Sequence, residues 1–112
     1  MSKFNTVTVN HRNTQSEFVL FEYHNADSRY DRKVVALPLT VLETAYSVCC
    51  TPLVHLDKDG KLVIGRGTTD IWQREDLRAI NEKGFYAEMC NGTFVGLVPL
   101  TEARAREILA AQ

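Results

Sequence analysis

The chain has 112 residues, of which 45% are apolar and 24% are charged, and its 13 basic and 14 acidic residues leave a net charge of −1. This length and composition predict one globular domain, residues 1–112, with a core large enough to fold without metal or disulfide crosslinks. The balanced charge argues against a polyanion-binding surface and against an acidic mimic of nucleic acid.

Three strands are predicted in the first third of the chain. Alternation of apolar and polar residues in 4–11 (FNTVTVNH) indicates a first strand. Residues 17–24 (EFVLFEYH) are apolar on both faces, which is typical of a central strand. A third apolar run, 34–39 (VVALPL), follows a polar stretch.

A short, largely buried helix is expected next. Thr40 is suited to be its N-cap and Glu43 completes a capping box. A broad apolar stripe follows, and Pro52 disfavours helical geometry at Thr51, so the helix should end there. The stripe consists of Val41, Leu42, Ala45, Val48 and Cys49.

The middle of the chain predicts a second strand-strand-helix unit. Residues 52–65 (PLVHLDKDGKLVIG) indicate two strands joined by a turn in which Gly60 takes positive φ. A helix is expected after GRGTTD, with Asp70 and Gln73 as one candidate capping box, and it should run to Lys83, with Leu77 and Ile80 as its core positions.

The last third predicts a hairpin and a helix. Asn91-Gly92 between apolar runs is the signature of a type I′ turn, which pairs Cys90 with Thr93 and, further along, Tyr86 with Leu97 and Phe85 with Val98. This register predicts which side chains share one face of the hairpin: Phe85, Ala87, Met89, Phe94, Gly96 and Val98. Thr101 then caps a final helix with Ala105, Ile108 and Leu109 facing inward, and Glu102 pairs with Arg106 on its outer side.

Together these segments predict an α+β domain. A leading strand and three strand-strand-helix units build a mostly antiparallel sheet of about seven strands, with the helices on one face. The first and third units share Pro-Leu-Thr at 38–40 and 99–101, where proline ends a strand and threonine caps a helix. Duplication and independent local solutions both account for this similarity.

One sheet face is too apolar for a simple two-layer monomer. If helices cover the face with Phe85 and Met89, then Tyr86, Val95 and Leu97 lie on the opposite face. Large exposed apolar patches usually mark interaction surfaces. Either the sheet curls toward a barrel or a second subunit covers this face, and we expect a homodimer or partner interface at these three residues.

A second candidate interface is the loop 24–33 (HNADSRYDRK). Arg29, Tyr30 and Arg32 belong to the residue types enriched among binding hot spots, and the loop is longer than most hairpins need. Asp27 and Asp31 partly neutralise it, which favours a protein partner over nucleic acid. A simple solvated loop is the alternative.

The segment 65–70 (GRGTTD) is the candidate ligand site. At a strand-to-helix junction, unpaired backbone N–H groups with Arg66, Gly67, Thr68 and Thr69 would suit phosphate or carboxylate. The segment matches neither the Walker nor the dinucleotide pattern, and Asp70 would compete with an anion. An ordinary capped turn is therefore the alternative.

Other chemistries lack a supporting pattern. DKDGK at 57–61 does not have calcium-loop spacing, and the histidines and cysteines form no chelating pair, so no metal or cofactor is expected. No motif beside Cys90 suggests an oxyanion hole or an activating base. The odd number of cysteines, with Cys49 and Cys50 adjacent, favours reduced and buried thiols.

These observations favour a small non-enzymatic interaction protein, an adaptor, regulator or inhibitor that binds another protein and forms a homodimer. An anion- or nucleotide-binding module at the GRGTT junction and a nucleic-acid-binding protein are the weaker alternatives, and an enzyme is the least favoured class. A cytoplasmic protein without membrane association is expected, because no apolar run reaches the roughly 18 residues of a membrane span and residues 1–11 lack the apolar core of a secretory signal.

Overall fold

The computed structural model describes residues 4–11, 14–44 and 49–112. Its elements follow the predicted order of a leading strand and three strand-strand-helix units, which confirms the α+β class and the seven-stranded, mostly antiparallel sheet. The strands are β1 (Thr6–His11), β2 (Thr14–Asn25), β3 (Val34–Pro38), β4 (Cys49–Leu56), β5 (Leu62–Trp72), β6 (Tyr86–Cys90) and β7 (Thr93–Pro99). The helices are α1 (Leu39–Thr44), α2 (Arg74–Lys83) and α3 (Glu102–Ala110).

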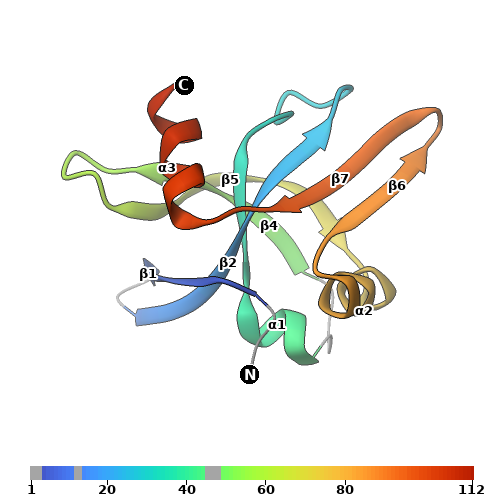
Figure 1. Ribbon diagram of the computed structural model, residues 1–112, viewed down its shortest axis with the longest axis horizontal. Coiled ribbons are helices and arrows are strands. Elements are labelled where there is room, and N and C mark those ends of the chain that lie inside the picture. The colour runs from blue at the N-terminus through green and yellow to red at the C-terminus, as the bar shows by residue number, and fades with distance from the viewer. Residues whose placement is uncertain (1–3, 12–13, 45–48) are drawn as a thin grey trace.

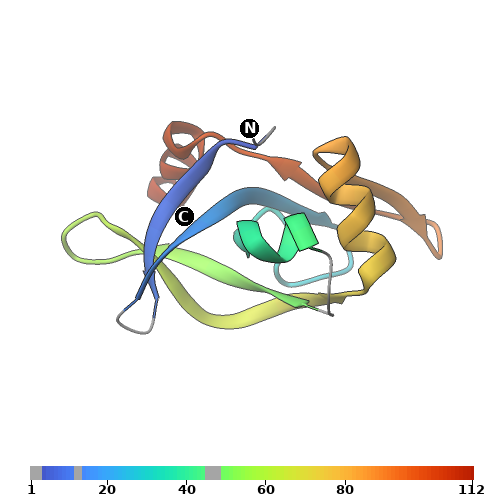
Figure 2. The same cartoon turned by 90° about the horizontal axis from the view of Figure 1, so that it is seen from below.

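The first five strands close into a ring. Each is antiparallel to its neighbour in the sequence, from β1 through β5. Because an odd number of strands alternates in direction, β5 runs the same way as β1, and a parallel pairing of Asn10 with Val63 closes the ring. Figures 1 and 2 show how strongly the strands curve to do so. Of the two solutions expected for the apolar faces, the sheet adopts the curled one.

The central strand is β2, as its two apolar faces predict. It pairs with β3 along one edge. Along its other edge it pairs first with β1, up to Val19, and then with β7, from Phe21 onward. The hairpin of β6 and β7 is therefore attached to the ring through β2 and extends away from it (Figure 1).

Two cores lie on opposite faces of β2 and β3. Alternate residues of β2 divide between them: Val19, Phe21 and Tyr23 belong to the first core, Phe18 and Leu20 to the second. The first core also contains Leu42 from α1 and Leu77 and Ile80 from α2, whereas the second contains Leu100 and Ala105.

The expectation that all three helices lie on one face is therefore wrong for α3. Both faces of β2 and β3 are apolar, so both require a cover. The backbone N–H of Leu100 bonds to Leu20 O, which leads the chain from β7 onto the second face, where α3 packs. The predicted inward positions of α3 are confirmed: Ala105 is fully buried, and Ile108 and Leu109 pack against the second core.

Two helix boundaries differ from the prediction. Leu39 is already helical in α1, so Thr40 is not its N-cap, and Cys49 through Pro52 form the start of β4 rather than a helix end. Two predicted stripe positions, Ala45 and Val48, lie outside the described residues. Residue Gln73, not Asp70, caps α2, because the box forms between Gln73 and Asp76, one turn later than predicted.

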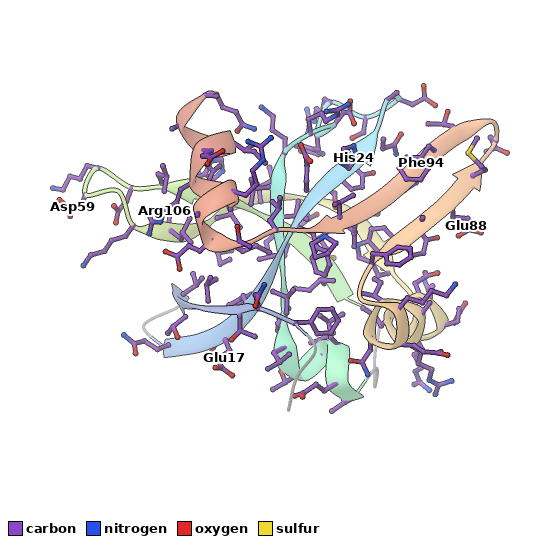
Figure 3. All side chains as sticks on the ribbon, in the orientation of Figure 1. Glu17, His24, Asp59, Glu88, Phe94 and Arg106 are labelled. Carbon is purple, nitrogen blue, oxygen red and sulfur yellow. The ribbon has the colours of Figure 1, made fainter. Side chains whose placement is uncertain are left out.

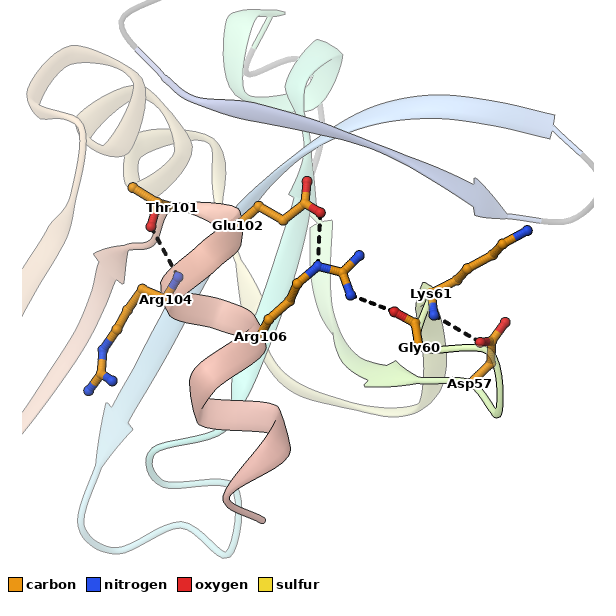
Figure 4. A network of polar contacts seen from close by, with 7 residues as sticks. All are labelled: Asp57, Gly60, Lys61, Thr101, Glu102, Arg104 and Arg106. Carbon is orange, nitrogen blue, oxygen red and sulfur yellow. Dashed lines mark hydrogen bonds and ion pairs between the residues drawn. The ribbon is translucent and has the colours of Figure 1, made fainter.

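A polar network fastens α3 to the turn between β4 and β5 (Figure 4). The Arg106 guanidinium donates from Nε to Glu102 Oε2 at 2.9 Å, as predicted for an i,i+4 pair, and from Nη1 to the carbonyl of Gly60. Gly60 has the predicted positive φ, 79°, and Asp57 Oδ1 accepts the backbone N–H of Lys61 at 2.9 Å. The start of α3 is capped by Thr101, whose hydroxyl accepts the N–H of Arg104.

Candidate functional site: the outer face of the β6–β7 hairpin

The hairpin has the predicted turn and register. Asn91 and Gly92 have φ of 51° and 83°, as a type I′ turn requires. Cys90 pairs with Thr93, and the register continues to Tyr86 opposite Leu97. The local sequence thus determines which side chains share a face.

The inner face of the hairpin belongs to the first core. Val95 and Leu97 are buried there, and the ring of Tyr86 meets that of Trp72 edge-on with centroids 4.9 Å apart. The prediction of an exposed interface at Tyr86, Val95 and Leu97 is therefore wrong. These residues lie on the covered face of the hairpin, and the opposite face is the exposed one. Leu97 lies opposite Tyr23 of β2, so both side chains point to the side that α1 and α2 cover.

The opposite side of the hairpin, which we call the outer face, is open to solvent. Its large apolar side chains are Phe85, Met89, Phe94 and Val98, with exposed fractions of 45, 63, 44 and 42%. The Phe94 ring covers the backbone of Gly96, where an added Cβ would lie 2.7 Å from the ring. Glycine here lets the aromatic ring lie flat against the sheet.

Polar groups of β2 border the outer face. His24 lies opposite Gly96, its ring centroid is 6.4 Å from that of Phe94, and its Nε2 is 3.1 Å from Glu22 Oε1. Figure 3 shows His24 and Phe94 on adjoining strands. The predicted loop residue Arg32 lines a hollow of about 180 Å³ together with His24 and Phe94. An apolar centre with a polar border is the usual composition of a protein interface.

The base of the outer face is hollowed. Where β1 and β7 part along β2, a hollow of about 360 Å³ opens between their ends and the end of α2. Phe85 belongs both to this hollow and to the outer face, and Lys83 supplies a charge at its wall. The hollow is lined by Phe4, Asn5, Val19, Lys83, Gly84, Phe85, Pro99, Leu100 and Thr101.

The loop residues predicted to bind a partner separate in space. Arg29 lies over the Tyr30 ring at 4.9 Å and donates to its hydroxyl at 2.8 Å, while Tyr30 packs against the first core. Arg32, with φ of 65°, instead reaches the side of the outer face. The Thr93 hydroxyl bonds to the Asp27 carboxylate, which ties the loop to the hairpin turn. Only Arg32 of the three thus adjoins the outer face.

The predicted anion site assumed a strand-to-helix junction at 65–70, and the structure has no such junction there. Arg66, Gly67, Thr68 and Thr69 lie within β5, and the N-terminus of α2 begins beyond them at Gln73. Gly67 takes a φ of 91° where the pairing of β4 with β5 shifts register, so the glycines accommodate an irregular strand rather than a strand-to-helix turn. The Thr69 hydroxyl bonds to that of Thr51.

The sequence gives no indication of a partly buried polar cluster around Tyr23. The Tyr23 hydroxyl donates to Asp70 Oδ2 at 2.6 Å and accepts from Asn25 Nδ2 at 2.9 Å. Nearby on β4 and β5, Trp72 Nε1 donates to Thr51 Oγ1 at 3.1 Å. Apolar periodicity carries no information about such partners, because they meet only when β2 and β5 are brought together.

In residues 4–11, 14–44 and 49–112, the other cysteines, histidines and carboxylates do not gather into a site. Cys50 and Cys90 are exposed, so the expectation of burial is wrong for both. Among the described residues, no three His, Cys, Asp or Glu side chains lie close enough together to hold a metal ion. A hollow of about 450 Å³ beside α3 is lined by charges of both signs, which select no ligand class.

Comparison of the chain with known protein families, with curated proteins and with solved structures found no significant match. None of the helices in the described part of the chain has the length and apolar character needed to cross a membrane.

Proposed function

We propose that this protein acts by binding another protein through the outer face of its hairpin. The observation that supports the proposal is the row of large apolar side chains at Phe85, Met89, Phe94 and Val98 on a sheet face open to solvent. Keeping apolar surface in water is unfavourable, and contiguous patches of this kind usually mark interaction surfaces. Association with a complementary apolar surface would remove that cost.

The surroundings of the outer face indicate the chemistry of the partner. The hollow at its base, about 360 Å³, suits an inserted aromatic or aliphatic side chain. His24, Glu22 and Arg32 along the other border offer polar contacts of both charge signs. A protein with an apolar anchor surrounded by polar residues fits this arrangement better than a polyanion does.

The test compares three forms of the chain as baits in its native cell: wild type, Met89→Thr/Phe94→Thr, and Ile71→Thr. Threonine keeps strand propensity. Ile71 is 62% exposed on β5, outside the hairpin, so its variant is a matched control for the loss of exposed apolar surface.

A partner bound through the outer face should be recovered with wild type and with Ile71→Thr. The hairpin variant should bind that purified partner at least about tenfold more weakly, because removing interface anchors usually costs about 1.4 kcal/mol or more. Recovery of the same proteins, with the same Kd, by all three baits would refute the proposal.

A further inference from the structure

The free edge of β6 is available for pairing with another strand. Among the strands of the described residues, β6 is the last in the sheet order, and β7 occupies one of its edges. In a hairpin with a two-residue turn, the residues that flank the turn form a hydrogen-bonded pair. Cys90, Glu88 and Tyr86 thus bond to β7, whereas the N–H and C=O of Ala87 and Met89 point to the free edge. Residues 86–90 contain no proline, lysine or bulge, which are three of the features with which proteins block exposed edges; Glu88 is the one charged side chain in this five-residue strand.

Two copies of residues 85–89 (FYAEM), paired antiparallel, place chemically complementary side chains opposite each other. In an antiparallel pairing centred on Ala87, Phe85 faces Met89 of the second copy, a favourable contact between an aromatic ring and a thioether. Within one chain the Tyr86 hydroxyl already donates to the Glu88 carboxylate. The pairing sets Tyr86 opposite Glu88 of the second copy, so this hydroxyl can donate to either carboxylate and no two carboxylates face each other directly. Both pairs occur twice, and the small Ala87 meets itself. A pairing centred on Glu88 would instead set two carboxylates against each other, which is unfavourable.

The space beside the edge also suits a second strand. A hollow of about 320 Å³ separates β6 from α2 and is lined by Phe85, Tyr86, Ala87 and Glu88 from the hairpin and by Asp76, Ala79 and Lys83 from the helix. Asp76 Oδ2 already accepts the backbone N–H of Gln73 in the α2 cap. Lys83 offers a counter-charge to an incoming Glu88, although Asp76 adds a like charge to the same hollow. Figure 3 shows Glu88 on the side of β6 away from β7.

We propose that a second copy of this chain pairs its β6 antiparallel to this β6, about a two-fold axis at Ala87. The two hairpins then form one four-stranded sheet in which both outer faces lie side by side. This inference extends the proposed function, because the dimer presents one wider apolar face to a partner, but it concerns the edge of the hairpin rather than its face.

Cysteine crosslinking tests the register of this pairing. In a Cys49→Ser/Cys50→Ser/Cys90→Ser background, which removes all three native cysteines, Ala87→Cys places two thiols across the axis on Cα atoms about 5.5 Å apart, a separation that a disulfide spans. Mild oxidation should convert most of this variant to a covalent dimer, whereas Glu88→Cys should remain largely monomeric. Equal crosslinking of the two variants, or preference for Glu88→Cys, would overturn the proposed register.

Proline substitution separates the dimer from the fold. Ala87→Pro removes an N–H that points to the free edge, so the variant should keep the circular dichroism spectrum and Tm of the monomer and lose dimerisation in sedimentation equilibrium. Glu88→Pro removes an N–H bonded to β7 and should lower the Tm. In the wild-type protein, the Ala87 amide should exchange its hydrogen more slowly as concentration rises through the dimerisation range.

A wild-type chain that stays monomeric up to millimolar concentration would refute the pairing, with or without the variants. That result would leave the proposed function standing if partner binding still depended on Met89 and Phe94. Conversely, a dimer lost in Ala87→Pro, together with unchanged binding by Met89→Thr/Phe94→Thr, would support the pairing and refute the proposed function.

Discussion

Tyr23 places a hydroxyl group between the polar side chains of Asp70 and Asn25 while its ring lies in the first core. Burial, and then the hydrogen bond to Asp70, raise the pKa of Tyr23 from 10.0 to about 12. Because the folded state holds this proton more tightly than the unfolded chain, the stabilisation is fully present below pH 10 and is lost as the pH rises from 10 to about 12.

We predict that the free energy of unfolding falls over this range and that Tyr23→Phe makes the fall shallower, since phenylalanine has no proton to lose. Urea denaturation at a series of pH values measures both slopes. The same slope in Tyr23→Phe and wild type would contradict the prediction.

Thr51 is the acceptor for a buried indole. Trp72 Nε1 donates to its hydroxyl at 3.1 Å, and Thr51 is fully buried. Thr51→Val keeps the shape of the side chain but leaves both the indole N–H and the Thr69 hydroxyl without this partner, so we predict a loss of about 1–3 kcal/mol in the free energy of unfolding. Chemical denaturation measures it, with the exposed Thr68→Val on β5 as the control, expected within about 0.5 kcal/mol of wild type. Equal effects would show that the hydrogen bond contributes nothing.

Among the elements, α3 is attached to the ring by a polar contact of Arg106. Arg106 bonds both to Glu102 within the helix and to the carbonyl of Gly60 in the β4–β5 turn. Arg104 bonds to Glu107 on the exposed side of the same helix. Arg106→Gln should therefore cost about 0.5–1.5 kcal/mol and Arg104→Gln close to nothing. The midpoints of urea denaturation of the two variants measure this difference. Hydrogen exchange of the amides in the β4–β5 turn should accelerate only in the Arg106 variant.

The hairpin shows what sequence determines at the scale of an element. Its register was predictable because Asn91 and Gly92 both tolerate positive φ, which fixes every pairing back to Tyr86. Which face would be buried was not predictable, because both faces are apolar. That choice depends on the pairing of Leu97 with Tyr23, a contact between segments more than seventy residues apart.

The prediction of an anion site at 65–70 was wrong for a different reason. Its glycines resemble a turn, and both Asp70 with Gln73 and Gln73 with Asp76 have capping-box spacing. The structure uses the later box, because β5 continues through the glycines and Trp72 reaches the first core as part of a strand. Tertiary burial of Trp72 thus overrides the local turn preference, and the predicted anion site disappears with the early helix start.

At the scale of the whole molecule, the two cores are separated only by the thickness of the sheet. Successive residues of β3 alternate between them: Val35 and Leu37 belong to the first, Val34 and Ala36 to the second. A strand cannot lose its packing on one face and retain its position on the other. The two cores should therefore unfold together, as expected for a single domain of 112 residues.

The single tryptophan, Trp72, reports on the first core alone, which makes this coupling measurable. Leu20→Ala alters only the second core and should cost about 2–5 kcal/mol. We predict that it shifts the urea midpoint of tryptophan fluorescence by the same amount as that of far-ultraviolet circular dichroism. Leu37→Ala, in the first core, is the reference for a direct effect. A fluorescence midpoint that stays in place while the dichroism midpoint falls would mean that the faces of the sheet unfold separately, and that the ring does not transmit the loss of packing from one core to the other.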